Sequence, residues 1–129
     1  MLEDLNVMVV EDELLIALDL SMTLEENGAR VTGPFAALRD ALSAADGARI
    51  DVAVLDVDLA GSDVFPLADA LSRRGVPLLF HTGRGELASL RSRYGGAAEA
   101  ICKGGPACNV VHHVMRLAGR SGPEAAPAA

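Results

Sequence analysis

Short apolar blocks alternate with longer amphipathic stretches along most of this chain. A continuously apolar block such as Val7-Met8-Val9-Val10 is typical of a parallel strand that helices cover on both faces. We predict five strands, over residues 7–10, 30–33, 52–55, 76–81 and 98–102. Because a helical stretch follows each predicted strand, the pattern favours βαβ units wound into one parallel sheet.

The helical stretches place apolar residues at the spacing of one helix face. Over residues 13–27, Ile16, Leu20 and Leu24 share a face, and Asn27-Gly28 supplies a stop signal. Further helices are predicted over residues 35–45, 64–73 and 107–118, with a short one inside the glycine-flanked segment 83–96. The predicted fold class is α/β: a doubly wound, five-stranded parallel sheet (flavodoxin-like, strand order 2-1-3-4-5) flanked by five helices.

The chain has 129 residues, which suits a single domain that we place at residues 1–119. Residues 120–129 hold Gly, Pro and Ala with little apolar bulk, so we predict a disordered C-terminal tail. We expect no output domain after it.

Composition excludes several classes of partner. A formal net charge of -7 and few aromatic residues argue against direct binding to nucleic acid. The chain starts on Met1-Leu2-Glu3-Asp4 and has no apolar run of bilayer length, so we expect a cytoplasmic protein that makes no membrane contact. Cys102 and Cys108 do not form a C-x-x-C pair, and we interpret them as reduced structural thiols.

Polar residues gather where the predicted strands end. Glu11 and Asp12 follow the first strand, Asp56 the third, Thr82 the fourth and Lys103 the fifth. In an open α/β sheet, ligands bind beyond the carboxyl ends of the strands, at the point where the winding reverses. These side chains therefore predict one functional site.

The chemistry of these residues points to phosphoryl transfer. Crowded carboxylates repel one another unless a cation neutralises them, and Mg²⁺ suits Asp12 and Asp56 with Glu11 in support. Asp56 can then attack a phosphoryl donor as a carboxylate nucleophile and form an aspartyl phosphate. Lys103 and Thr82 would hold the phosphate oxygens.

The segments Val9-Val10-Glu11-Asp12-Glu13, Leu55-Asp56 and Thr82-Gly83, together with Lys103, resemble the receiver domain of two-component response regulators. The resemblance implies that Asp56 is the phosphoacceptor and that Glu11 and Asp12 bind the metal. The backbone carbonyl of Asp58 would complete the metal shell. It also implies a sensor histidine kinase or a histidine phosphotransfer protein as phosphodonor and an unidentified downstream protein. A receiver is no enzyme beyond its own phosphorylation and autodephosphorylation.

The segment Pro77-Leu78-Leu79-Phe80-His81-Thr82-Gly83 is similar to the P-F-x-F-A-T-G motif of a receiver group prominent in alphaproteobacteria, many of which stand alone. His81 replaces the alanine of that motif. Gly104 follows Lys103 where receivers usually have a cis proline, so we expect a trans or reshaped loop. Ala100 stands where a switching aromatic is common, so we predict that phosphorylation instead orders the segment 83–96.

Three alternatives stay open at this point. Asp56-Val57-Asp58 also matches the D-x-D of phosphatases of the haloacid dehalogenase type, although that leaves Glu11 and Asp12 idle. A flavin-binding module shares the fold class, but no phosphate-cradling loop follows the first strand. A receiver that has lost phosphorylation would act by protein binding alone.

Several other polar residues receive structural interpretations. Alternation places His81 on the opposite face from Thr82, where packing is its expected role. Asp58 and Arg84 are predicted to pair across the site. We expect the remaining histidines and arginines of note to lie on solvated faces: His112, His113, Arg73, Arg74 and residues 91–93.

Overall fold

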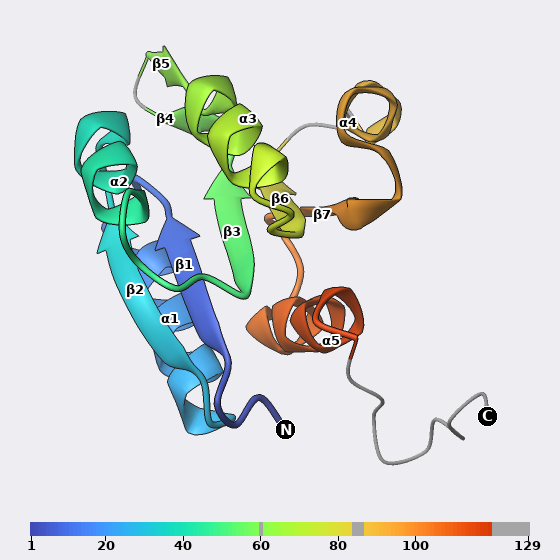
Figure 1. The fold of residues 1–129 in the computed structure, drawn as a ribbon. Coiled ribbons are helices and arrows are strands. Elements are labelled where there is room, and N and C mark those ends of the chain that lie inside the picture. Colours follow the sequence, from blue (N-terminus) through green and yellow to red (C-terminus); the bar gives the residue numbers. More distant parts are fainter. Residues whose placement is uncertain (60, 84–86, 120–129) are drawn as a thin grey trace, which may run out of the picture.

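A computed structural model describes residues 1–59, 61–83 and 87–119 of the chain. It contains a five-stranded parallel sheet whose strands lie in the order β2-β1-β3-β6-β7 (Figure 1). These strands are β1 (Asn6–Val10), β2 (Arg30–Phe35), β3 (Val52–Asp56), β6 (Leu78–Thr82) and β7 (Ala98–Cys102). Counted along the chain, this is the predicted order 2-1-3-4-5, which confirms the fold class.

Five α-helices flank the sheet: α1 (Leu14–Glu26), α2 (Leu38–Ala45), α3 (Phe65–Arg73), α4 (Leu87–Tyr94) and α5 (Ala107–Leu117). A 3-10 turn, Gly95–Ala97, leads from α4 into β7. A small antiparallel hairpin, β4 (Asp58–Leu59) and β5 (Ser62–Asp63), follows β3. No helix among the described residues is both long and apolar enough to cross a membrane.

The sheet separates two apolar cores, because side chains alternate along each strand. Val7 and Val9 of β1 are buried in a core with α1 and α5. Met8 and Val10 point the other way, into a core with α2, α3 and Leu90 of α4. The strands are therefore apolar on both faces, as the continuous block in the sequence predicts.

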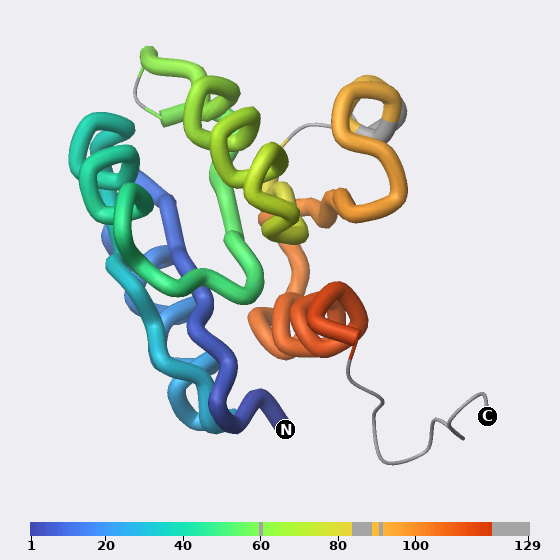
Figure 2. Tube along the Cα trace, in the orientation of Figure 1, coloured from blue at the N-terminus to red at the C-terminus, as the bar shows by residue number. Residues whose placement is uncertain are grey.

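The amino ends of the strands carry the chain termini of the described domain. Met1 and the end of α5 both lie there, away from the carboxyl ends of β1 and β3 (Figure 2). The carboxyl ends of these strands are therefore free of both these termini, and the predicted site residues lie there.

Several element boundaries differ from the prediction, and main-chain hydrogen bonds explain two of the differences. The second helix does not begin at Phe35, because the Phe35 carbonyl accepts a hydrogen bond of 2.9 Å from the Glu11 N–H and stays extended beside β1. The fourth strand of the sheet begins at Leu78 rather than at Val76. The Val76 N–H still donates to the Leu71 carbonyl, at 3.0 Å, and closes the end of α3.

Two predictions concern residues that the structure exposes. Arg74 is exposed, as predicted, and its guanidinium also donates to the carbonyls of Ala45, the last residue of α2, at 2.6 Å and of Ala48 at 2.8 Å. Cys102 and Cys108 are free thiols, as predicted, but both are exposed and so do not pack in a core.

Candidate functional site

A cleft of about 640 Å³ opens at the carboxyl ends of β1, β3 and β6. Its lining includes most of the residues that the strand ends predict, together with the β4–β5 hairpin: Asp12, Glu13, Asp56, Val57, Asp58, Gly61, Ser62, Asp63, Phe65, Thr82, Gly83 and Lys103. Because the sheet winds in opposite directions from β1 and β3, the cleft lies where the fold class places ligands.

Three carboxylates meet at this edge of the sheet. Oxygen atoms of Glu11, Asp12 and Asp56 all lie within 4.8 Å of one another. Glu11 and Asp56 are each only 2% exposed, whereas Asp12 is half-buried. The structure thus brings together the acids that the sequence predicts as metal ligands.

Main-chain N–H groups hold the two buried carboxylates in place. The Asp58 N–H donates to Asp56 Oδ1 at 3.1 Å, and the Glu13 N–H donates to Glu11 Oε2 at 3.0 Å. Both donors lie two residues beyond the acid that they bind, shortly after the ends of β3 and β1. The Asp58 side chain itself is exposed and lines the cleft.

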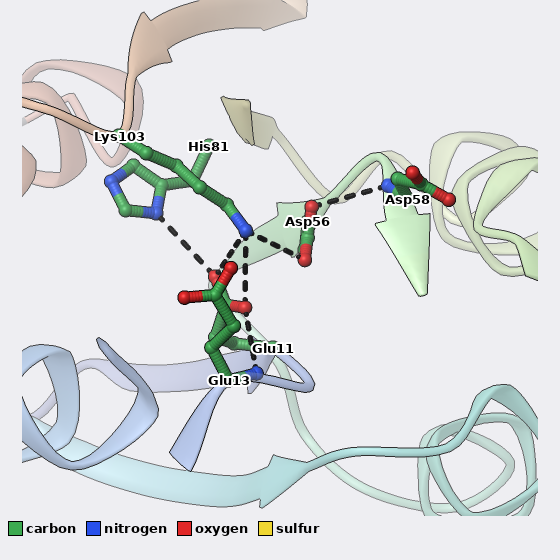
Figure 3. Close-up of polar contacts among 6 residues, drawn as sticks. All are labelled: Glu11, Glu13, Asp56, Asp58, His81 and Lys103. Carbon is green, nitrogen blue, oxygen red and sulfur yellow. Dashed lines mark hydrogen bonds and ion pairs between the residues drawn. The ribbon is translucent and has the colours of Figure 1, made fainter. Parts of the chain in front are cut away.

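Lys103 bridges the two buried acids (Figure 3). Its Nζ lies 2.8 Å from Asp56 Oδ2 and donates to Glu11 Oε2 at 3.1 Å. The Lys103 N–H also donates to the Thr82 carbonyl at 2.9 Å, which ties the end of β7 to the end of β6. The only cis peptide bond in the described ranges is Gly33-Pro34, so the Lys103-Gly104 bond is trans, as predicted.

The pKa values of the two buried acids, Glu11 and Asp56, shift in opposite directions. Burial raises the pKa of Asp56 to about 6, because the opposing hydrogen bonds from Lys103 and Asp58 do not compensate for it and the Glu11 charge adds to it. Burial also raises the pKa of Glu11, but the contacts of its carboxylate with His81, the Glu13 N–H and Lys103 outweigh this and lower it to about 2. Glu11 therefore carries the firmly ionised carboxylate of the two.

His81 lies closer to the acids than sequence reasoning predicts. Thr82 lines the cleft and His81 does not, as alternation requires, but the His81 Nδ1 is 3.8 Å from Glu11 Oε1. Packing alone is therefore an incomplete interpretation of His81. The signal for its position is the strand register, which pairs Asp56 of β3 with His81 of β6.

Two further predictions concern the β6–β7 connection. Arg84 lies outside the described residues, and so does its predicted pairing with Asp58. Ala100 is half-buried in β7 and contributes only a methyl group to the core. An aromatic ring from α4 lies nearby instead. Tyr94 contacts Phe80, the β6 residue paired with Ala100, with ring centroids 5.4 Å apart.

Comparison with known proteins gives structural neighbours only. No protein-family model matches the chain, and no curated protein sequence matches it. The fold is similar to that of a response regulator receiver protein from Sinorhizobium medicae, with a TM-score of 0.78 and 22% identity over 92% of this chain and 98% of that one.

Two other solved structures show the same likeness. The non-phosphorylated HemR receiver domain from Leptospira biflexa has a TM-score of 0.78 and 24% identity, over 95% of this chain and all of that one (100%). The signal receiver domain of a modulated diguanylate cyclase from Desulfovibrio desulfuricans has a TM-score of 0.74 and 28% identity, over 89% and 94% of the two chains. The chain therefore has the fold of response regulator receiver domains.

Proposed function

We propose that this chain is a phosphorylation-dependent signalling switch of a two-component system that accepts a phosphoryl group on Asp56. One observation carries the proposal: at an open cleft, the buried Asp56 carboxylate lies within 4.8 Å of two further acids and 2.8 Å from the Lys103 Nζ. A nucleophilic carboxylate needs this combination of neighbouring metal ligands and a phosphate-binding cation.

The residues at the cleft fit Mg²⁺. The donor set consists of hard carboxylate oxygens within 4.8 Å of one another, and Glu11 is held ionised. Asp12, Asp56 and the Asp58 carbonyl would hold the ion, with Glu11 in support. When bound, Mg²⁺ neutralises charge on the acids and on the phosphoryl oxygens.

The chain's own residues then position the transfer. An Asp56 oxygen attacks the donor phosphorus, a new O–P bond forms, and the bond from phosphorus to the donor's leaving group breaks. Lys103, which already contacts Asp56 at 2.8 Å, neutralises charge on the phosphoryl oxygens, and Thr82 at the adjacent strand end donates its hydroxyl. Hydrolysis of the aspartyl phosphate returns the switch to its resting state.

The alternatives account for less of this geometry. A phosphatase of the haloacid dehalogenase type would use the Asp58 side chain and leave the buried Glu11 without a role. A flavin phosphate would meet the carboxylates of Glu11, Asp12 and Asp56 directly. A receiver that acts by binding alone has no need for Lys103 to reach Asp56, which it does despite the Gly104 that follows it.

One helix face supports a protein as the phosphodonor. Leu14, Leu15, Leu18 and Met22 of α1 are 69%, 81%, 44% and 59% exposed. Residues 1–29 contain no Lys or Arg, and Glu13, Asp19, Glu25 and Glu26 are exposed around this face. An apolar patch with an acidic margin fits a partner whose apolar surface has a basic margin, such as a sensor histidine kinase or a histidine phosphotransfer protein. Leu15 shares a small cavity with Lys103, so this partner would sit beside the cleft.

The direct test is incubation of the full chain with acetyl phosphate and Mg²⁺, read by intact mass. We expect one phosphoryl adduct on the wild type and none on Asp56→Asn. Asp63→Asn is the matched control, because Asp63 is an exposed acid of the same cleft and Asn keeps its acceptor for the Phe65 N–H. An adduct that persists in Asp56→Asn, or a wild type that takes none, would refute the proposal.

A further inference from the structure

Two buried polar atoms face each other beside the cleft without a hydrogen bond. They are His81 Nδ1 and Glu11 Oε1, 3.8 Å apart, on side chains that are 6% and 0% exposed. Buried polar atoms in native proteins almost always have a partner, so such a pair calls for an explanation. In the described residues, the only other side-chain atom of this kind is Ser21 Oγ, on α1.

Glu11 currently depends on Lys103 for part of its neutralisation. Lys103 Nζ lies 3.1 Å from each Glu11 oxygen, but only the contact to Oε2 has hydrogen-bond geometry. The Glu13 N–H donates to Oε2 as well. Both donors therefore bind Oε2. The nearby side-chain nitrogen that could still donate a hydrogen bond to Oε1 is His81 Nδ1.

The position of His81 fits this second role. His81 lies next to Asp56 across the β3–β6 pairing, and its ring points at Glu11 (Figure 3). The ring also lines a cavity of about 170 Å³ on the α1 side of the sheet, together with Lys103, Leu15 and Asp19. The ring is therefore not packed on all sides and borders open space beside Lys103.

We propose that His81 is a positioning residue that holds the Glu11 carboxylate for the metal and frees Lys103 to bind the phosphoryl group. The inference rests on the proposed function and adds to it a residue that replaces the alanine of the motif this segment resembles. In this role, His81 Nδ1–H donates to Glu11 Oε1 both while Lys103 contacts Glu11 and after the Lys103 ammonium has turned towards phosphate oxygens. Glu11 then keeps its orientation and its partner throughout the cycle.

Calorimetric titration of the full chain with Mg²⁺ alone tests the role. Partners that orient a metal ligand are worth roughly 10–100-fold in metal affinity. We expect His81→Leu and His81→Ala to weaken Mg²⁺ binding by about tenfold or more, and His81→Asn, whose amide can still donate, to stay within about threefold of wild type. In a Glu11→Gln background, His81→Leu should have no further effect. The unfolding midpoints of all variants show whether any loss is merely structural.

A second measurement does not need the metal. Nitrogen-15 spectra of the histidine rings in the metal-free protein should show Nδ1 of His81 protonated, and Glu11→Gln should shift the His81 signals while those of His112 and His113 stay in place. Unchanged Mg²⁺ affinity in His81→Leu and His81→Ala, or His81 signals indifferent to Glu11→Gln, would overturn the positioning role. A wild type that binds no Mg²⁺ would instead contradict the proposed function.

Discussion

Asp56 illustrates at the residue scale how the requirements of a site oppose stability. Its carboxyl is 2% exposed and lies near the ionised Glu11, so the pKa of Asp56 rises to about 6. At neutral pH the group is nevertheless ionised, and the folded state carries the cost of a buried charge that the unfolded chain does not. The proposed function accounts for this cost, because a carboxylate that attacks a phosphoryl donor must be charged.

The first prediction follows from that cost. A raised folded-state pKa means that the stabilising protonation of Asp56 is complete at low pH and is lost as pH rises through about 6. Asp56→Asn should therefore increase the free energy of unfolding of the metal-free protein, and by on the order of 1 kcal/mol more at pH 7.5 than at pH 5. Urea unfolding followed by circular dichroism at the two pH values measures this. A gain that is equal at both pH values would count against the raised pKa.

The sequence correctly predicts that the acids and Lys103 lie close together. This prediction needs only the rule that the carboxyl ends of parallel strands meet at one edge of the sheet. Glu11, Asp12, Asp56, Thr82 and Lys103 all end at one edge of the sheet. The contact between His81 and Glu11 was not predictable in this way. It depends on the register between β3 and β6 and on the reach of the Glu11 side chain, neither of which a single sequence encodes locally.

At the element scale, α1 carries an exposed apolar face in addition to the face that it buries against the sheet. We predict that Leu18→Ser with Met22→Ser lowers the rate of phosphotransfer from the protein donor at least tenfold relative to labelling by acetyl phosphate. Leu42→Ser on α2, on the opposite face of the sheet, is the control and should leave this ratio alone. Added salt should also slow the protein donor, because it screens the acidic margin. A ratio that the α1 changes do not alter would exclude this face as the docking surface.

Tyr94 anchors α4 to the rest of the domain. Its ring contacts Phe80 and Phe65, and its hydroxyl donates to Asp69 at 2.7 Å. Tyr94→Phe removes only the hydrogen bond and should cost about 1 kcal/mol of unfolding free energy, whereas Tyr94→Ala should cost about 3 kcal/mol. Urea unfolding distinguishes them; similar losses would mean that the rings contribute little.

The same anchor bears on signalling. That phosphorylation orders segment 83–96 stays a prediction. Residues 84–86 lie outside the described residues, so the prediction is applied here to α4. Beryllofluoride should raise amide protection over Leu87–Tyr94, and it should do so less in Tyr94→Ala, which lacks the ring that joins α4 to the cleft residue Phe65. Equal hydrogen exchange with and without beryllofluoride would rule out this mechanism.

Strand and helix types could be predicted at this scale, whereas several boundaries could not. The end of β2 depends on the hydrogen bond between Glu11 and Phe35, which joins positions far apart in the sequence. The β4–β5 hairpin pairs only two residues on each side, so it leaves no periodic pattern to find. In both cases tertiary hydrogen bonds decide what local propensity leaves open.

For the whole molecule, we predict from the acidic cluster that stability depends on divalent ions. Mg²⁺ that binds the folded state alone should raise the free energy of unfolding by about 1.4 kcal/mol at a concentration ten times its Kd. Thermal unfolding with Mg²⁺ and with chelator should show the shift in the wild type and a smaller one in Asp12→Asn. Sodium chloride at matched ionic strength controls for screening of the net charge of -7. An equal Mg²⁺ shift in Asp12→Asn would place the ion elsewhere.

The tie between Thr82 and Lys103 has a practical consequence. These residues are held together by the β6–β7 pairing and one main-chain hydrogen bond. Because the two strands are parallel, the chain leaves this edge of the sheet after Thr82 and returns to it only at the end of β7. At Gly95 and Gly96 an added Cβ would meet no atom within 4 Å, and both glycines precede β7, at the end of that strand away from the cleft. We therefore predict that a fluorescent protein spliced between them leaves the cleft intact, so that its light could be tested as a reporter of the proposed phosphorylation.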